Sequence, residues 1–319
     1  MLIKGDVSVN SSLDLKTKES FRRVSVEYGC VPILFPDRGT TPLSSIVDQL
    51  TELYVFVDDF LTAHPDLAQW RHSPHNTPEF ADAEVLTLAL LQGCLGVASL
   101  KQTYRLVAHN YRSAFPQLCS YPQWIARLHS LTALTSALLL TTTQIPAESP
   151  AFSLIDAKPL PVCHRLRHGR VRLLREDGAY WGKTSKGWFF GFKLHVLRHI
   201  EGRIVKVVLT PGNWEDRAPV LALLDGVEGG VTLGDLGYRG KQRAEEWAEE
   251  AGMLVLTRAD APEKKYLLAQ VRQAIETSFS QLWYKFIDRV FSRSWRGLWN
   301  TVQLKVIHYN LCHAGVLSR

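Results

Sequence analysis

The sequence is poor in cysteine, and the cysteines that it has are not grouped. Five are scattered along the chain, with no two in a CxxC pair, at Cys30, Cys94, Cys119, Cys163 and Cys312. This spacing argues against a zinc ribbon and against a disulfide framework, which need paired or regularly spaced cysteines. It fits a protein of a reducing cytoplasm.

Targeting and membrane segments are also missing from the sequence. The first 20 residues contain no apolar region of the kind that signal peptides carry. The most apolar run, at 131–140, is interrupted by Thr and Ser and is shorter than the roughly 20 residues that a membrane helix needs. We therefore expect a cytoplasmic location and no membrane partner.

Positive charge is scarce in the first half of the chain and abundant in the second. Residues 1–150 carry 11 Lys and Arg against 14 Asp and Glu, a net charge of −3, whereas residues 151–319 carry 26 against 17, a net charge of +9. A basic half suggests a polyanionic partner, most often nucleic acid. The alternative is that the charge serves solubility alone.

The 319 residues, 46% of them hydrophobic, are enough for roughly two domains behind a short extension. Residues 1–40 are polar and predict a loosely ordered N-terminal extension. Residues 41–148 predict an all-helical domain for DNA binding or dimerisation, with helices starting at the cap-and-proline pairs Thr41–Pro42, Thr77–Pro78 and Tyr121–Pro122. One of these helices carries an apolar stripe formed by Trp124, Leu128, Leu131, Leu134 and Leu138.

The periodicity changes after the linker at 144–150, and residues 149–319 predict a mixed α/β domain. Strands are expected at 151–156, 187–197, 202–213, 230–235 and 253–260, the second and third of them antiparallel. Helices are expected at 214–227, with Asp216 near its start, at 241–252 and at 262–283.

Three acids lie where a catalytic site would need them. Asp156 and Asp235 each end an apolar strand, the place where open sheets bind ligands, and Glu276 lies beside an apolar stripe on the last helix. Two aspartates and a glutamate could hold two Mg²⁺ ions, which prefer oxygen ligands and act in phosphoryl transfer. The alternatives are a turn or cap role for each aspartate and an ordinary ion pair of Glu276 with Arg272.

Five sequence blocks support the catalytic interpretation by resemblance. In chain order they are LIDAKPLPVC, GFKLHVL, TPGNWEDR, TLGDLGYRGK and RQAIETSFSQL. Together they resemble bacterial insertion-sequence transposases with a D-D-E site, most closely the insertion sequence 982 family, over roughly residues 80–319.

The resemblance implies a ribonuclease-H-like catalytic fold and cut-and-paste DNA chemistry with two Mg²⁺ ions, for which Mn²⁺ can substitute. By motif position it implies Asp156, Asp235 and Glu276 as the catalytic and metal-binding triad, with Arg272 where relatives place an arginine. Relatives often add a tyrosine seven residues before the glutamate and a lysine seven after it. Ala269 and Trp283 occupy those positions here, so these two roles are not carried over.

Cations and aromatic residues around these blocks are candidate DNA contacts. The candidate DNA-binding residues are Lys158, Arg165, Arg167, Arg170, Arg172, Lys193, His195, Arg239, Lys241, Arg272, Arg289, Arg293, Arg296, Lys101 and Arg105. Lys101 and Arg105 are proposed to read the element ends from a helix in the major groove. Trp188 and Trp214 are candidates for stacking on unpaired bases. The alternatives are exposed solvated side chains for the cations and core positions for both tryptophans.

The sequence thus predicts a DNA transposase that cleaves its element ends and joins the 3′-OH ends to target DNA. Its expected partners are double-stranded DNA, as terminal inverted repeats and target, and a second copy of itself, in a bacterial cytoplasm at the nucleoid. A metal-dependent nuclease of the same fold that only cuts is one alternative. A domesticated sequence-specific DNA-binding protein is another, against which the intact acids argue.

Overall fold

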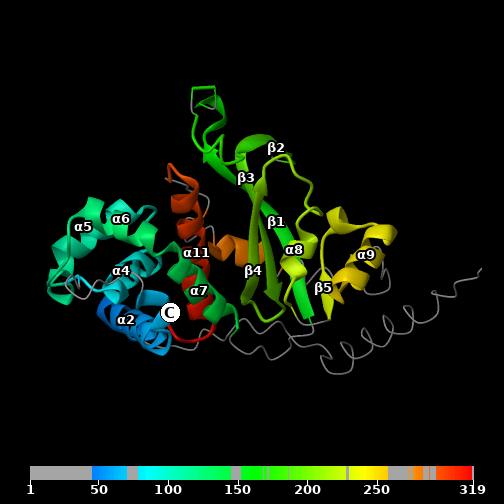
Figure 1. The fold of residues 1–319 in the computed structure, drawn as a ribbon. Helices are drawn as coiled ribbons and strands as arrows, with labels where there is room; N and C mark the ends of the chain where they lie inside the picture. The colour runs from blue at the N-terminus through cyan, green and yellow to red at the C-terminus, as the bar shows by residue number, and fades with distance from the viewer. Residues whose placement is uncertain are drawn as a thin grey trace, which may run out of the picture. The chain divides into compact units, whose positions relative to one another are not determined.

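The structure, a computed structural model, describes most of the chain beyond residue 44. The described residues are 45–69, 78–144, 152–167, 169–170, 172–185, 187–227, 230–257, 273, 276–282, 287 and 292–317. The predicted extension at 1–40 lies outside them. Residues from Pro42 to Arg319 form one compact unit, in which helices precede a mixed sheet with helices (Figure 1).

Among the described residues, six α-helices come before the sheet, and their starts differ from the predicted ones. They are α2 (Ile46–Ala63), α3 (Asp66–Gln69), α4 (Asp82–Leu95), α5 (Leu100–Asn110), α6 (Tyr121–Ser130) and α7 (Thr132–Thr143). Ser45 caps α2 in a capping box with Asp48, while Thr41 and Thr77 lie outside the described residues. The predicted start at Pro78 is wrong because α4 begins at Asp82, and Ser120 rather than Tyr121 is the residue before α6. Ser, Thr, Asp and Asn are about equally good at the position before a helix, so the sequence alone did not identify which of them begins each helix.

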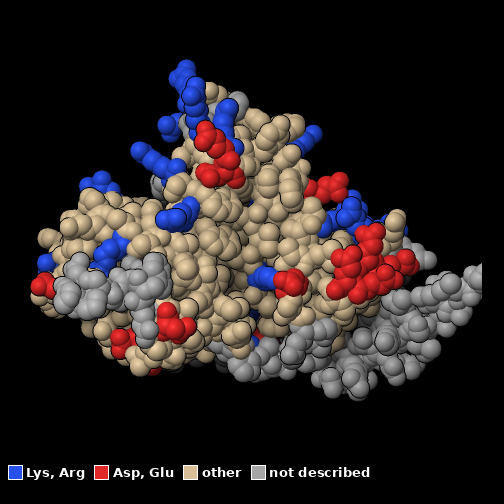
Figure 2. Space-filling view, viewed as in Figure 1, with Lys and Arg blue, Asp and Glu red and all other residues tan. Residues whose placement is uncertain are grey.

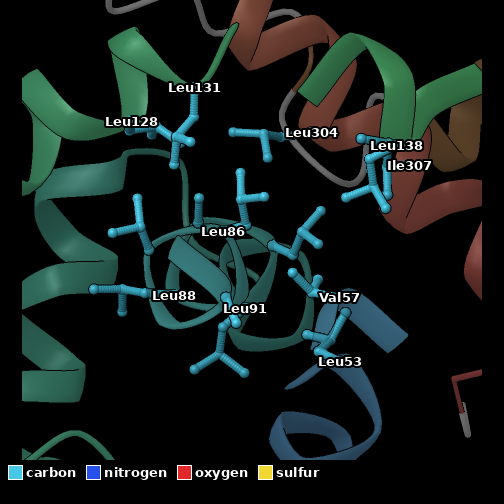
Figure 3. Close-up of a cluster of buried hydrophobic side chains, with 14 of the residues drawn as sticks. Leu53, Val57, Leu86, Leu88, Leu91, Leu128, Leu131, Leu138, Leu304 and Ile307 are labelled. Atoms are coloured by element: carbon cyan, nitrogen blue, oxygen red, sulfur yellow. The ribbon is translucent and has the colours of Figure 1, made fainter. Parts of the chain in front are cut away.

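The predicted apolar stripe is confirmed as part of the helical core. Trp124, Leu128, Leu131, Leu134 and Leu138 are all buried, although the helix breaks at Leu131 between α6 and α7. They pack with buried residues of α2 and α4 (Figure 3). The Trp124 indole also donates a hydrogen bond to the Val85 carbonyl at 3.1 Å, which satisfies its polar atom inside the core.

The C-terminal helix α11 (Trp295–His313) belongs to the same core. Leu304, Ile307 and Leu311 lie among the helical-core residues (Figure 3). At Gly93 of α4, an added Cβ atom would overlap the ring of His308, so only glycine allows this close approach. The helix that ends the chain therefore completes the core that the first helices begin.

The same helix is also tied to the sheet. The side-chain amide of Asn310 accepts a hydrogen bond from the Ile204 N–H at 2.9 Å and donates one to the Ile204 carbonyl at 2.9 Å. Because Asn310 is fully buried, both of these bonds replace water that the backbone has lost. The predicted boundary near residue 148 and the role of 41–148 as a separate DNA-binding or dimerisation domain stay predictions.

The sheet contains six strands in mixed orientation. They are β1 (Phe152–Cys163), β2 (Tyr180–Thr184), β3 (Gly187–His199), β4 (Ile204–Pro211), β5 (Val231–Leu233) and β6 (Leu254–Leu256). Strand β3 pairs antiparallel with both β1 and β4. On the other side of β1, β5 pairs parallel with β1, and β6 pairs parallel with β5. This mixed sheet, with helices before and around it, confirms the predicted ribonuclease-H-like fold class (Figure 1).

Two elements of the sheet region differ from the sequence prediction. The sequence analysis missed β2, whose five residues pair with the first part of β3. The predicted helix at 214–227 is only α8 (Val220–Leu224), so Asp216 lies in the loop before it. With α9 (Lys241–Ala251), α8 covers one side of the sheet, where Leu223 and Trp247 pack with Ile155.

The first strand is longer than predicted, because it continues past Asp156 to Cys163. It pairs with β3 over most of its length but with β5 only over residues 152–154, so one edge is open beyond Leu154. The Ala157 N–H binds the Asp156 side chain and thus points to this open edge. Pro159 and Pro161 follow Ala157 at intervals of two residues, so their nitrogens face the same edge. A proline there lacks an N–H group that would not have bonded to β3, so no hydrogen bond between β1 and β3 is lost.

In the part of the chain that the structure describes, no single helix is long and apolar enough to cross a membrane. One bent pair, α4 with α5 at 98°, reaches the required length and composition, and most of α4 is buried in the helical core.

Candidate active site

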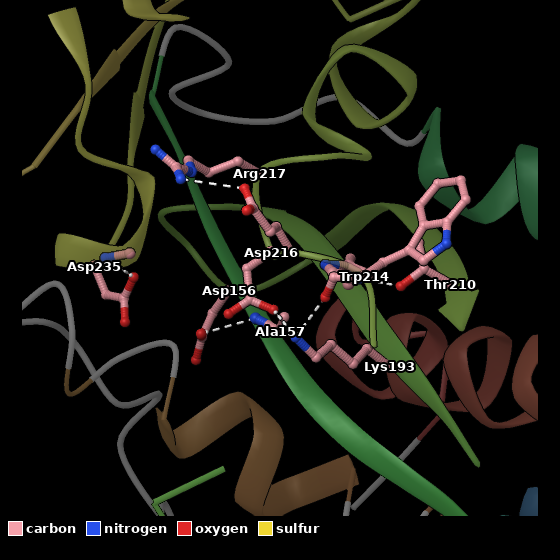
Figure 4. Close-up of polar contacts among 11 residues, drawn as sticks. Asp156, Ala157, Lys193, Thr210, Trp214, Asp216, Arg217 and Asp235 are labelled. Atoms are coloured by element: carbon pink, nitrogen blue, oxygen red, sulfur yellow. Dashed lines mark hydrogen bonds and ion pairs between the residues drawn. The ribbon is translucent and has the colours of Figure 1, made fainter. Parts of the chain in front are cut away.

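The register of the sheet places two of the predicted acids at the same level. Leu154 of β1 pairs with Leu233 of β5, and Asp156 and Asp235 each follow two residues later. Because the two strands are parallel, these side chains lie at the same edge, where β5 ends and no described strand pairs with β1 on that side (Figure 4). Asp156 is therefore inside a strand, whereas Asp235 is in the turn that follows one.

Backbone hydrogen bonds orient both carboxylates. Asp156 Oδ1 accepts from the Ala157 N–H at 2.7 Å, and Asp235 Oδ1 accepts from the Gly237 N–H at 2.8 Å. Lys158 lies on the same face of β1, with its Nζ 3.6 Å from Asp156 Oδ2. One oxygen of each acid is thus fixed by the backbone, which limits how the other can turn.

The charged form of Asp156 is disfavoured in the folded protein. Burial of its side chain, which is 18% exposed, raises its pKa from 3.8 to about 6. Lys158 and the Ala157 N–H lower this pKa, while the negative charges of Asp235 and Asp216 raise it further. Burial is the largest cause of the raised pKa, and a bound cation would favour the ionised form of Asp156.

Glu276 lies on a different element, in the helical residues 276–282, and its side chain is exposed. Phe279 on the same helix is buried, and Lys158 Nζ lies 5.5 Å from the centre of its ring. Lys158 therefore contacts both Asp156 and the helix that carries Glu276. Among the described residues, no three His, Cys, Asp or Glu side chains lie close enough to hold a metal ion together.

The donor set fits a hard divalent cation in its chemistry. Asp156 and Asp235 offer carboxylate oxygens at the same edge of the sheet, and the charge of Asp235 contributes to the raised pKa of Asp156. Mg²⁺ keeps several waters and shares its remaining positions with substrate phosphates, so two protein carboxylates can be enough to hold it.

The comparison of this chain with known proteins agrees with the fold. Residues 147–284 match the family described as transposase DDE domain. This part of the chain is therefore similar to a DDE domain. The match extends from the start of β1 to the end of the helical residues that include Glu276, and such a domain implies an enzyme of phosphoryl transfer.

A curated relative points in the same direction. The chain is 24% identical over 191 residues to the "Transposase for insertion sequence element IS1106" of Neisseria meningitidis serogroup B. The alignment covers 52% of this chain and 66% of that protein, just under two thirds of the length of the relative. No solved structure matches the chain.

Most of the described candidate DNA-binding cations are exposed around the DDE domain or on the helices. Exposed side chains are found for Lys158, Arg167, Arg170, Arg172, Arg239, Arg293, Arg296, Lys101 and Arg105. Lys and Arg side chains gather at the end of the sheet near β2, whereas acidic side chains gather over α9 (Figure 2). On the face shown, cations are thus most numerous at the β2 end, although some acidic side chains lie among them (Figure 2).

Two predicted DNA contacts are not available as solvent-facing groups. His195 has no exposed surface, and its Nε2 lies 2.8 Å from Thr210 Oγ1. The side chain of Lys193 is 14% exposed, and its Nζ donates to Trp214 O at 2.7 Å and to Asp216 Oδ1 at 2.8 Å. The alternative of a solvent-exposed strand face is also wrong for this pair, because α8 packs against β3 and β4 adjoins it.

The tryptophans are on the surface, so the alternative that placed them in the core is wrong. Trp188 is 58% exposed and Trp214 is 49% exposed. Trp188 forms part of an aromatic row on the β2–β3 pair, with Trp181 at 6.4 Å between ring centres and Lys183 Nζ 5.7 Å from the Trp188 ring. Their predicted stacking on DNA bases stays a prediction.

Some predicted residues lie outside what the structure describes. These are Arg272, Arg289, Ala269 and Trp283, together with the side chains of Arg165 and Lys241. The structure adds one acid that the sequence prediction did not include in the site, Asp216, which lies close enough to Asp156 to raise its pKa. The sequence signal for it was weak, since the predicted helix over 214–227 placed it as an ordinary first-turn acid.

Proposed function

We propose that this protein is a DNA transposase that cuts the ends of an insertion sequence and joins the freed 3′-OH ends to target DNA. The observation that carries the proposal is the match of residues 147–284 to a transposase DDE domain. It is supported by the sheet register, in which Leu154 pairs with Leu233, two residues before Asp156 and Asp235 respectively. Its proposed class is the insertion sequence 982 family, on the five sequence blocks described above.

In this proposal Asp156, Asp235 and Glu276 bind two Mg²⁺ ions, for which Mn²⁺ can substitute. Bound metal supplies a Lewis acid for the phosphodiester and lowers the pKa of the attacking water or hydroxyl. Lys158 contacts both Asp156 and Phe279, which supports a role in holding the strand and the Glu276 helix at a fixed separation.

The DNA is proposed to lie across the basic side chains near β2 and away from α9. Arg167, Arg170 and Arg172 are exposed there, and phosphate contacts of this kind fix the position of a duplex without reading its sequence. Trp188, which is 58% exposed on the β2–β3 hairpin, is proposed to stack on an unpaired base at the cut end. A homodimer, working at the bacterial nucleoid, would bring the two element ends into one complex.

The test incubates the full chain with duplexes that carry its own element ends and with Mg²⁺, and scores strand cleavage and strand joining separately. Cleavage followed by joining is the expected result. Cleavage without joining would assign the protein to the metal-dependent nucleases. Specific binding without either reaction would identify a DNA-binding protein with a silent site.

The same assay tests the triad residue by residue. Asp156→Asn, Asp235→Asn and Glu276→Gln each remove one carboxylate charge with little change of shape, so each should reduce cleavage to background while DNA binding persists. Asp225→Asn is the matched control, because Asp225 is an exposed aspartate bound to Lys206 rather than a member of the triad. Near-normal cleavage by a triad variant would remove that residue from the site.

A further inference from the structure

Lys193 is a mostly buried cation that fixes the loop between β4 and α8. Its Nζ donates to the Trp214 carbonyl at 2.7 Å and to Asp216 Oδ1 at 2.8 Å, and its side chain is 14% exposed. Burying an ammonium group is costly unless it is paired with good geometry, which these two acceptors supply. The loop is thereby held against β3 with the Asp216 side chain at a defined place.

That place is beside the candidate active site. The negative charge of Asp216 raises the pKa of Asp156, as does that of Asp235, so all three acids interact through space. In Figure 4 the Asp216 carboxylate lies next to that of Asp156, and Lys193 approaches it from the other side. Asp216 Oδ2 accepts no hydrogen bond from any residue that the structure describes, and the side chain is 41% exposed.

A buried hydroxyl also points to a missing partner at this place. Tyr238 is 2% exposed, and its hydroxyl has no hydrogen-bond partner among the described residues. Burial raises the pKa of this hydroxyl, and the negative charges of Asp156, Asp216 and Asp235 raise it further, so the hydroxyl lies on the side of the core that faces the acids. A buried polar group without a partner is rare in folded proteins and marks a place for a bound water or ion.

We propose that Asp216 lies beside Asp156 as a further acid of this site, that Lys193 is the residue that positions it, and that its carboxylate acts through a bound water on a divalent cation held by Asp156, because the described acids do not lie close enough for three of them to bind one ion directly. The inference rests on the proposed function for the identity of the cation. Three carboxylates face only Lys158 and Lys193 among the cations that contact them, so the described site has surplus negative charge. Because Mg²⁺ and Mn²⁺ keep bound waters, Asp216 can act on the ion through one of them.

The experiment titrates the full chain with Mn²⁺ in isothermal calorimetry, without DNA. The variants are Asp216→Asn, Lys193→Met and the two combined. Lys206→Met and Asp225→Asn are matched controls, because this lysine and aspartate form the same kind of pair. Lys206 Nζ donates both to the backbone carbonyl of Asp225 and to its carboxylate, with 3.3 Å to Oδ2. Thermal unfolding of each variant verifies that it is folded.

Asp216→Asn should weaken Mn²⁺ binding by about tenfold or more, the range seen for groups that act around a metal site. Loss of the Lys193 charge alone would strengthen cation binding, so weaker binding by Lys193→Met reports the loss of positioning. The double variant should bind no worse than Asp216→Asn, because Lys193 acts through Asp216. The two controls should bind as the wild type does.

Unchanged Mn²⁺ affinity in Asp216→Asn, or tighter binding by Lys193→Met, would overturn the inference, as would a wild-type protein that binds no Mn²⁺ without DNA. These results are separate from the fate of the proposed function. A wild-type protein that binds Mn²⁺ through Asp216 and cuts no DNA fails only as a transposase. One that cuts and joins DNA, with Asp216→Asn binding Mn²⁺ normally, fails only in this inference.

Discussion

The imidazole of His195 lies in the middle of β3 with no exposed surface. Burial lowers its pKa from 6.5 to about 4, Lys193 lowers it further, and Asp216 opposes both. The folded protein therefore keeps His195 neutral at pH values where the unfolded chain would protonate it. Its Nε2 is hydrogen-bonded to Thr210 Oγ1 at 2.8 Å, which ties β3 to β4 inside the sheet.

This residue predicts an acid-sensitive stability. Between about pH 6.5 and pH 4 the unfolded chain binds a proton that the folded protein does not, so the free energy of unfolding falls as the pH falls. Between pH 7 and pH 5 the loss from this group is about 2 kcal/mol. His195→Gln, whose amide can still reach Thr210, should remove that part of the pH dependence, measured by denaturant unfolding at both values. An unchanged pH slope would show that other groups cause the acid loss.

At the scale of elements, the helix that carries Glu276 is anchored by a buried polar network. The hydroxyl of Tyr309 on α11 lies 2.9 Å from Ser278 Oγ and 3.0 Å from the Gly202 carbonyl. Arg198, at the end of β3, also donates to Ser278 Oγ. Three elements therefore meet at Ser278, two residues after the proposed catalytic glutamate.

We expect Tyr309→Phe to lower the free energy of unfolding by about 1–2 kcal/mol, because buried partners lose a hydrogen bond. It should also reduce DNA cleavage, since the helix with Glu276 loses an anchor. Tyr104→Phe is the matched control, as Tyr104 donates to the Cys119 carbonyl at 2.8 Å within the helical part. A similar loss of stability with normal cleavage is expected there. Equal cleavage by the two variants would show that the hydrogen bonds at Ser278 do not affect the activity.

Helix α5 is the element proposed to read the element ends. Lys101 and Arg105 are one turn apart and exposed, while Thr103 and Val107 on the other side are buried. The double substitution Lys101→Ala, Arg105→Ala should abolish the preference for terminal-repeat over scrambled duplexes in a binding assay and retain generic affinity. An unchanged preference would assign end recognition to the segment with Arg293 and Arg296, whose side chains are also exposed.

At the scale of the whole molecule, charge is divided between the halves of the chain. The helical half has a net charge of −3 and the half with the DDE domain +9. Within the second half the acids collect over α9 and the cations at the β2 end of the sheet (Figure 2). Generic affinity for DNA is therefore expected from the β2 end.

Neutralising Arg167, Arg170 and Arg172 together tests this expectation. If each of them contacts a phosphate, binding to any duplex should weaken, and the slope of log K against log salt should change by roughly 0.9 per lost contact. Lys206→Gln is the control, because this cation is not a candidate DNA contact and its Nζ lies 3.3 Å from Asp225 Oδ2. A salt slope equal to that of the wild type would leave the three arginines as solvated surface.

The sequence alone determined the elements whose physical signal is local. The strands at β3, β4, β5 and β6 appear as short apolar runs, and α9 ends at Gly252, whose left-handed φ of 64° suits the end of a helix. The ordered acids and the blocks around them were enough to predict the transposase resemblance, because catalytic chemistry constrains which residues occur. The prediction of a helix over 214–227 was wrong because residues 214 and 216 bind Lys193 instead of continuing the helix. Lys193 donates to the Trp214 carbonyl and to the Asp216 side chain, and this contact between distant residues is not visible in the local sequence.

Only the tertiary structure decided what depends on pairing between distant segments. The register of β1 against β5 put Asp156 level with Asp235, and the open edge of β1 let the strand continue through two prolines. The packing of α11 among the first helices, and the burial of Lys193 and His195, depend on contacts that no local pattern encodes. Burial and charge at a site are properties of all neighbours at once, and so the place of Asp216 beside Asp156 emerged only from the fold.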